Sequence, residues 1–241
     1  MNLILLAAGK SSRIYNKIKK NKCLIKINNK SLIRNIIDNS SGADISEINI
    51  ITGFKSQNIK KELKDYNKIK FTNNSKYKTT DMVYSSIIGL KKSKSDTIIS
   101  YTDIVYTKKL FQIIKKSNKN FITIPYIKNW KNVWKKRNKN IFEDAETFNV
   151  DKNSNLREIG NKINDKNLKL VNGQFMGTIF IPKKYINIII KKYNIYSNGK
   201  LQLTQFVNKL IKDNMIIKCV NYNDFWYEID DYEDLINFQK L

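Results

Sequence analysis

The fold is decided by the stretch Leu3-Ile4-Leu5-Leu6-Ala7-Ala8-Gly9-Lys10-Ser11-Ser12-Arg13. Its first four residues form an apolar run typical of a buried strand, and the run then breaks into small residues and a glycine. Backbone N–H groups in such a turn can approach a phosphate because no bulky side chain intervenes. Arg13 and, further along the chain, Lys22 add mobile positive charge. The stretch therefore predicts a strand that ends in a phosphate-binding loop.

Two other interpretations of the stretch are open. A plain buried strand and turn beside scattered lysines would give part of the pattern, because one basic residue at a given place means little in so lysine-rich a chain. A Walker-type P-loop is suggested by Gly9-Lys10-Ser11. That motif needs a glycine five places before Gly9, where the chain has Ile4, so we disfavour it.

The composition allows a sizeable core and limits the chemistry. The 241 residues, 41% of them hydrophobic, fit one large domain. Histidine is absent from the sequence, which removes histidine acid–base catalysis and most zinc sites. A metal would have to bind carboxylates and phosphates, which suits Mg²⁺. Cys23 and Cys219 form no metal-binding spacing and are expected to be free thiols.

No targeting or membrane segment is expected. No apolar stretch approaches the ~18 residues that a membrane-spanning helix needs. Residues 1–8 are too short for a signal peptide and lack its basic start. We therefore expect a cytoplasmic protein.

The net charge of +24 raises the possibility of a nucleic-acid partner. The excess consists of lysine rather than arginine, and it accompanies abundant asparagine and isoleucine. A/T-rich codons supply these three residues, so genome composition explains the charge without a dedicated partner. The basic segments at 17–20 and 131–139 belong to no nucleic-acid-binding motif. We expect only non-specific, salt-sensitive binding to nucleic acid.

Apolar and amphipathic segments alternate over the first half of the chain. Strands are expected at 3–6, 48–52, 69–72, 97–101 and 121–125, and helices at 32–39, 56–66, 79–90 and 108–116. Thr79 or Thr80 is the expected cap of the third helix. This alternation predicts βαβ units and an α/β fold, a Rossmann-like, mixed but mainly parallel sheet flanked by helices. Ligands of such sheets bind beyond the carboxyl ends of the strands.

The second half has a different character. Segments 145–150 and 156–159 are expected to form an antiparallel pair around a turn at 151–155. Further strands are expected at 176–181, 216–220 and 225–229, and helices at 185–192, 203–212 and 232–238. No repeat or linker marks a boundary, so we predict a single domain over 1–241 with a β-rich, substrate-binding lobe at about 125–180.

Asp103 follows the expected strand at 97–101, near the predicted phosphate loop. A carboxylate at that end of the sheet is well placed to hold Mg²⁺. It could instead cap a helix that starts near Thr107. The sequence therefore offers Asp103 as a candidate metal ligand with a structural alternative.

Motifs along the whole chain resemble those of small-molecule nucleotidyltransferases, and most closely the phosphocholine and 2-aminoethylphosphonate types of cytidylyltransferase. The first stretch resembles L-A-A-G-x-G-[ST]-R followed by P-K-x-L, with Ser11 at the second glycine and Asn21 in place of the proline. Segments that resemble further motifs follow in the same order, namely Thr79-Thr80-Asp81-Met82-Val83-Tyr84-Ser85, Asp103-Ile104-Val105-Tyr106 after Thr102, Lys128-Asn129-Trp130 with Trp134 and Arg137, Asp144-Ala145-Glu146, Glu158-Ile159-Gly160, Gly173-Gln174-Phe175-Met176-Gly177 and Trp226-Tyr227-Glu228-Ile229-Asp230.

The resemblance implies a nucleotide-diphospho-sugar transferase-like fold and Mg²⁺-dependent transfer of CMP from CTP, with release of pyrophosphate. It implies that Arg13 acts on the leaving pyrophosphate and that Lys22 bridges the α-phosphate and the incoming anion. Asp230 would be the second Mg²⁺ ligand beside Asp103. Asp230 or Asp231 could instead cap the last helix, and both roles are compatible if Asp231 is the cap. The nucleotide would contact Leu6, Ala7, Ala8 and Gly9 of the loop and the region of Thr80 and Ser85.

The acceptor would be a small phosphorylated or phosphonate amine. In the stretch that resembles the substrate-binding motif, aromatic residues and carboxylates lie close together in sequence, as a cationic head group requires. The candidate contacts are Trp130, Trp134, Asp144, Glu146 and Gln174. Trp130 and Trp134 could instead be core residues of one helix, since their spacing does not show which way they face.

Two alternative functions are open at this point. One is a sugar-1-phosphate nucleotidyltransferase on the same fold. The other is a non-catalytic nucleic-acid-binding protein on a decayed transferase scaffold, which the unusual residues Ser11, Asn21, Asp81 and Thr102 keep under consideration.

Overall fold

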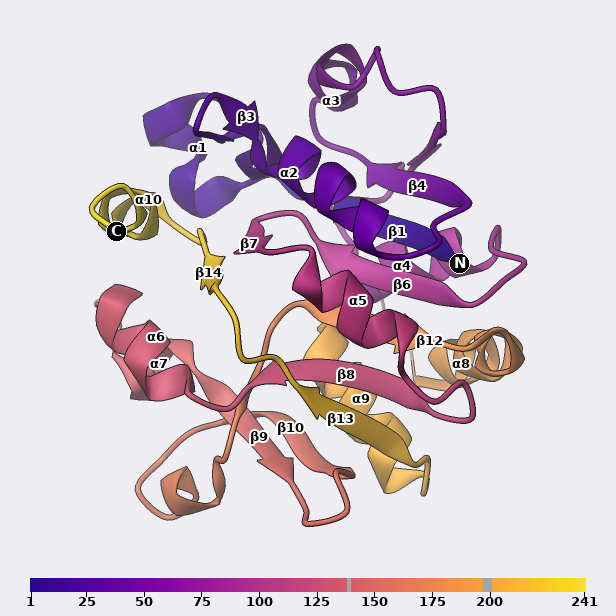
Figure 1. Ribbon diagram of the computed structural model, residues 1–241, viewed down its shortest axis with the longest axis vertical. Helices are drawn as coiled ribbons and strands as arrows, with labels where there is room; N and C mark the ends of the chain where they lie inside the picture. The colour runs from indigo at the N-terminus through magenta and orange to yellow at the C-terminus, as the bar shows by residue number, and fades with distance from the viewer. Residues whose placement is uncertain (138–139, 197–200) are drawn as a thin grey trace.

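An eight-stranded sheet forms the centre of the computed structural model, which describes residues 1–137, 140–196 and 201–241 (Figure 1). The strands along the sheet are β11 (Gln174–Phe175), β8 (Ile122–Ile127), β12 (Thr178–Ile181), β6 (Thr97–Tyr101), β1 (Asn2–Ala7), β4 (Glu47–Thr52) and β5 (Ile69–Asn73), and β13 (Ile217–Asn221) pairs with β8. β1 pairs in parallel with β4 and β6, as do β4 with β5 and β13 with β8. β11 and β12 run antiparallel to their neighbours. The predicted mixed, mainly parallel sheet is therefore confirmed.

Helices cover both faces of the sheet, so β1 is buried on both sides. Leu3 and Leu5 pack into one core cluster, and Ile4 and Leu6 into another, as the period of two along a strand requires. The helices of the first face are α2 (Leu32–Asn39) and α5 (Lys109–Lys115), and those of the second are α4 (Met82–Leu90), α8 (Lys183–Tyr196) and α9 (Leu203–Lys212) (Figure 1).

Smaller elements connect and extend these layers. They are α1 (Ser12–Ile18), the short helix η1 (Lys22–Leu24), β2 (Lys26–Ile27), β3 (Lys30–Ser31), η2 (Ser40–Gly42), α3 (Ser56–Glu62), β7 (Ile104–Tyr106), α6 (Trp130–Arg137), α7 (Ile141–Asp144), β9 (Glu146–Val150), β10 (Leu156–Lys162), η3 (Leu168–Leu170), β14 (Trp226–Glu228) and α10 (Tyr232–Phe238). β9 and β10 form the predicted antiparallel pair. β14 pairs with β7, which brings the end of the chain beside its middle.

Several boundaries differ from the sequence prediction. The helix expected at 56–66 ends at Glu62, because the following residues turn and Asp65 pairs with Arg34. The helix expected at 79–90 begins at Met82. The hydroxyls of Thr79 and Thr80 donate to the carbonyl of Lys76 in the preceding turn, so neither residue caps the helix.

Two further segments differ for backbone reasons. The strand expected at 176–181 begins only at Thr178 as β12, because Gly177, which separates it from β11, has a φ of +79°. The helix expected at 185–192 starts directly after Pro182 and extends to Tyr196. Among the residues that the structure describes, no helix combines the length and apolar character needed to cross a membrane.

Replacing Gly177 with alanine tests this interruption. A Cβ atom at Gly177 would lie 3.0 Å from the Tyr101 ring and would occupy the left-handed region. We expect Gly177→Ala to lower the free energy of unfolding by about 1–2 kcal/mol in urea titrations. Gly9→Ala is the matched control, since a Cβ there meets nothing within 4 Å. An equal loss in both variants would contradict the assigned strain.

Candidate active site

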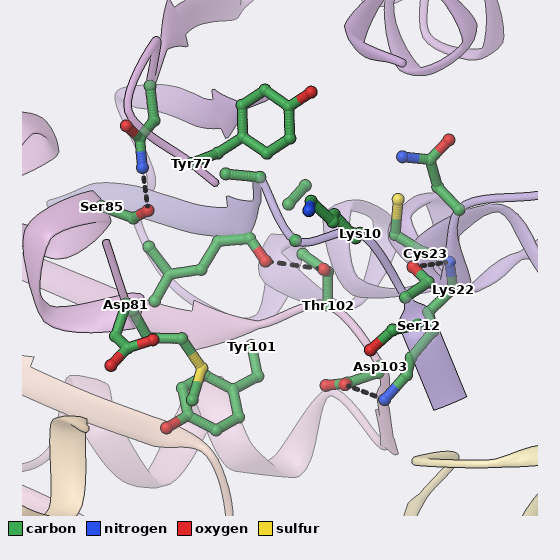
Figure 2. A pocket seen from close by; sticks show the side chains of 18 of the residues that line it. Lys10, Ser12, Lys22, Cys23, Tyr77, Asp81, Ser85, Tyr101, Thr102 and Asp103 are labelled. Carbon is green, nitrogen blue, oxygen red and sulfur yellow. Dashed lines mark hydrogen bonds and ion pairs between the residues drawn. The ribbon is translucent and has the colours of Figure 1, made fainter. Parts of the chain in front are cut away.

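A cavity of about 430 Å³ lies at the carboxyl ends of β1 and β6. Figure 2 shows Lys22 and Asp103 on one side of it and Tyr77 and Ser85 on the other. Ten of the residues singled out from the sequence line this cavity, namely Leu6, Ala7, Ala8, Gly9, Arg13, Lys22, Thr80, Ser85, Asp103 and Asp230. The fold therefore brings the predicted loop, both predicted cations and both predicted metal ligands together. Their chemical roles remain predictions.

The loop after β1 is held in a strained backbone conformation. Ser11 has a φ of 57°, in the left-handed region that glycine adopts at lower cost. Its hydroxyl accepts a hydrogen bond from the backbone N–H of Lys22 at 2.9 Å. Ser11, which replaces the glycine of the motif, therefore fixes the backbone of Lys22.

Asn21, which stands in place of the motif's proline, connects two loops of the cavity. Its side-chain amide donates to the carbonyl of Phe54 at 2.8 Å, and the N–H of Phe54 donates to the carbonyl of Ala8 at 3.1 Å. Gly53 permits this approach, since a Cβ there would lie 2.7 Å from the Ala8 carbonyl oxygen. The loops after β1 and β4 and the segment before η1 are thus tied to one another.

The ammonium group of Lys22 lies between two carboxylates from distant parts of the chain. Its Nζ is 3.2 Å from Asp103 Oδ2 and 2.5 Å from Asp230 Oδ1. The other carboxylate oxygen of Asp230 is bound by the guanidinium of Arg13. Lys22 is largely buried, whereas the Arg13 side chain is 69% exposed. Arg13 is therefore free to change partner more readily than Lys22.

Backbone hydrogen bonds explain why these carboxylates converge. The N–H of Ile229 donates to the carbonyl of Asp103 at 2.9 Å, which continues the pairing of β14 with β7. The hydroxyl of Thr102 donates to the carbonyl of Leu6 at 2.8 Å, so the end of β6 is fixed to the end of β1 (Figure 2). Asp103 is thereby held between the phosphate loop and the segment that carries Asp230.

The electrostatics keep Lys22 and Asp230 charged. Burial lowers the pKa of Lys22, but Asp103 and Asp230 raise it more, so its pKa lies above the ordinary lysine value. Burial raises the pKa of Asp230, but Lys22 and Arg13 lower it more, so its pKa lies below the ordinary value. Neither group changes charge near neutral pH. Burial raises the pKa of the neighbouring Glu228 to about 8, although Arg137 lowers it.

Two cavity residues with clear structural roles were missed by the sequence analysis. The Asn74 side chain donates to Ser85 Oγ at 3.1 Å and to Thr80 Oγ1 at 3.2 Å, and it therefore orients both hydroxyls. Asn74 directly follows β5. Its position as a polar residue at the carboxyl end of a predicted strand could have identified it from the sequence. Tyr77 lines the cavity beside Phe54, at a ring-centroid distance of 6.4 Å.

The prediction that Trp130 and Trp134 bind a cationic head group is wrong, since both rings lie in the core. Their exposed fractions are 2% and 4%. Trp134 stacks on Trp226 at 6.1 Å, and Trp130 packs edge-on against Trp134 at 5.8 Å. The two tryptophans share the inner face of α6, so no ring face is open to a ligand.

The other predicted acceptor contacts lie outside the cavity lining. Gln174 is buried, and its side-chain amide donates to the backbone carbonyl of Glu146, which is a structural contact. Asp144 Oδ2 lies 3.3 Å from Arg137 Nη1. Glu146 has a buried carboxyl whose pKa burial raises. Glu146 and Asp144 therefore remain candidate contacts by charge, whereas Gln174 is occupied by the fold.

The donor set at Lys22 suits a hard divalent cation. Asp103 and Asp230 supply carboxylate oxygens, which Mg²⁺ prefers, and the rest of its coordination shell commonly comes from phosphate and water. Over residues 1–137, 140–196 and 201–241, no group of three or more histidine, cysteine, aspartate or glutamate side chains is arranged to hold a metal. The pair therefore fits an ion that arrives with a nucleotide better than one held by the protein alone.

Comparison with known proteins identifies relatives of this chain. A CTP:phosphoglutamine cytidylyltransferase from Campylobacter jejuni is 32% identical over an alignment of 251 positions, which covers 98% of each chain. The inositol-1-phosphate CTP transferase from T. maritima superposes with a TM-score of 0.78 at 16% identity, over 97% of this chain and 90% of that one. The CTP:phosphocholine cytidylyltransferase from Streptococcus pneumoniae superposes with a TM-score of 0.72 at 17% identity, over 99% and 97%.

These likenesses confirm the nucleotidyltransferase fold that the motifs implied. Residues 3–136 match the MobA-like NTP transferase domain, and this region contains the phosphate loop, Lys22 and Asp103. The chain therefore belongs to the nucleotidyltransferase family that is defined by the MobA-like NTP transferase domain.

Proposed function

We propose that this protein transfers the CMP group of CTP to a small phosphorylated acceptor that carries an amino group, with release of pyrophosphate. The observation that carries the proposal is the position of Lys22 between Asp103 and Asp230 in the cavity bounded by the phosphate loop. The relative at 32% identity is a CTP-dependent enzyme by name, which favours CTP over other nucleotides.

The reaction needs positioning and charge stabilisation more than acid–base chemistry. An oxygen of the acceptor phosphate attacks the α-phosphorus of CTP, the bond from that phosphorus to the bridging oxygen breaks, and pyrophosphate leaves with the electron pair. A phosphate monoester is already anionic at neutral pH, so no general base is required. Lys22, held charged by its carboxylate neighbours, stabilises the charge that develops on the α-phosphate and the incoming oxygen.

Arg13 is assigned to the leaving pyrophosphate. Its guanidinium is mostly exposed and pairs with Asp230, so it can exchange this carboxylate for a phosphate at small cost in burial. Asp103 and Asp230 would hold Mg²⁺ together with the triphosphate. When bound, the ion neutralises phosphate charge.

The surroundings of Tyr101 support an acceptor with an ammonium group. Tyr101 lines the cavity and packs edge-on against Phe175 at 5.8 Å. Burial raises the pKa of Tyr101, and the nearby carboxylates of Glu228, Asp103 and Glu146 raise it further. An aromatic surface beside carboxylates attracts a cation. We therefore assign to Tyr101 the part first expected of Trp130 and Trp134.

Phosphoglutamine is the first acceptor to test, because it is the acceptor named for the 32% identical relative. Phosphocholine and 2-aminoethylphosphonate carry the same combination of a phosphorus oxyanion and a cationic nitrogen. A sugar 1-phosphate lacks the cationic nitrogen and would gain no attraction from the carboxylates near Tyr101.

A pyrophosphate-release screen tests the proposal. CTP, UTP, ATP and GTP are each combined with phosphoglutamine, phosphocholine, 2-aminoethylphosphonate, phosphoethanolamine and glucose 1-phosphate, with and without Mg²⁺. We expect release with CTP and an amino-bearing acceptor, dependent on Mg²⁺. Release with glucose 1-phosphate alone would instead assign the sugar-1-phosphate activity.

Removal of the Lys22 ammonium group tests the mechanism. We expect Lys22→Ala to lower kcat by roughly 10²–10³-fold, because the charge acts mainly on the transition state. Lys20→Ala is the matched control, since Lys20 is a nearby exposed lysine that does not line the cavity. Near-normal turnover in Lys22→Ala would disprove the assigned role.

A further inference from the structure

Arg137 is a buried cation, and two of its carboxylate partners, Asp234 and Glu228, lie on the segment that carries Asp230. Its Nε donates to Asp234 Oδ1 at 3.0 Å, and its Nη2 donates to Asp234 Oδ2 at 3.2 Å. Both side chains are completely buried. The guanidinium also lies over the Trp134 ring, 5.1 Å from its centroid. Arg137 therefore joins α6 to α10 through a bidentate, geometrically defined contact.

Asp234 transmits this constraint to the backbone of Asp230. Asp234 Oδ2 accepts hydrogen bonds from the N–H of Asp230 at 2.9 Å and of Asp231 at 3.2 Å. Asp231 caps α10 by accepting from the N–H of Asp234 at 3.0 Å. The turn that presents Asp230 to Lys22 is thus organised around the carboxylate that Arg137 holds.

The same guanidinium approaches the other side of this turn. Arg137 Nη1 lies 3.3 Å from Glu228 Oε2 and 3.3 Å from Asp144 Oδ2. Glu228 and Asp230 flank Ile229, whose N–H donates to the carbonyl of Asp103. The Arg137 guanidinium therefore contacts Glu228 before Ile229 and Asp234 after it, and Ile229 is the residue that is hydrogen-bonded to Asp103.

A buried ion pair is a poor means of stabilising a fold, because apolar side chains of similar volume do as well or better. Its distinctive property is that it fixes one geometry, since any displacement leaves a charge unpaired in a medium of low polarity. That property is useful where a carboxylate such as that of Asp230 must be placed accurately.

We infer that Arg137 and Asp234 are positioning residues, which hold the backbone of Asp230 so that its carboxylate meets Lys22. Neither residue lines the cavity, so they act through Asp230 and not on a substrate. The inference rests on the proposed function for its kinetic consequence, whereas its structural consequence is independent of that function.

Two conservative variants test the inference. Arg137→Lys keeps the charge but loses the bidentate contact. Asp234→Asn keeps the shape, but both oxygens of Asp234 accept hydrogen bonds, so the new NH₂ group must face a donor. Arg157→Gln is the matched control, because it removes another Arg–Asp pair, with Asp151, on the exposed turn between β9 and β10.

Each variant is compared with the wild type by hydrogen exchange of the peptide over residues 226–234, by thermal unfolding, and by kcat and KM for CTP. We expect faster exchange at Asp230 and Asp231 and a loss in kcat of about 10–100-fold, the range typical when a partner of a metal-binding side chain is removed. KM for CTP should change far less, because the phosphate loop is untouched. Arg157→Gln should match the wild type in both respects.

A folded Asp234→Asn protein with wild-type kcat overturns the inference, whether or not exchange is faster. If Arg137→Lys does not fold, Asp234→Asn decides the matter alone. If the wild type transfers no nucleotide to any acceptor, the proposed function fails. The exchange measurement then still decides whether Arg137 and Asp234 hold the Asp230 turn, and unchanged exchange rejects it.

Discussion

The candidate active site depends on the pairing of two segments that are remote in sequence, β7 and β14. The bond from the Ile229 N–H to the Asp103 carbonyl extends this pairing by one step and sets both carboxylates around Lys22. Contacts between such distant segments form late and at an entropic cost, so the site is completed only when the whole domain is folded. Local motifs supply the reactive groups, and tertiary pairing places them.

The charge of the protein and the charges of the site are arranged differently. The chain carries a net charge of +24, whereas at the site Lys22 and Arg13 are matched by the carboxylates of Asp103 and Asp230. The lysine-rich surface provides long-range attraction for a polyphosphate. Under the proposed function, the two carboxylates would provide local affinity for a divalent cation.

The sequence predicted those elements that can be recognised from the pattern of their own residues. α2, α9 and α10 have the predicted bounds, because each has helical apolar spacing and a definite start. The loop residues and Asp230 were predicted from their resemblance to motifs of the family, and Asp103 also from its place directly after an expected strand. Trp130 and Trp134 were misassigned, because helical spacing cannot show that this face meets Trp226. β7 was missed because only its pairing with β14 makes three residues a strand.

Asn21 restrains one loop of the site in a different way from the proline that the motif has at this place. A proline at this place restrains the backbone through a covalent ring, an entropic effect on the unfolded chain that persists at any temperature. Asn21 restrains it through a hydrogen bond to the Phe54 carbonyl, which is an enthalpic tie that loosens on warming. The restraint on this loop therefore weakens as the temperature rises, whereas the restraint from a proline ring would persist.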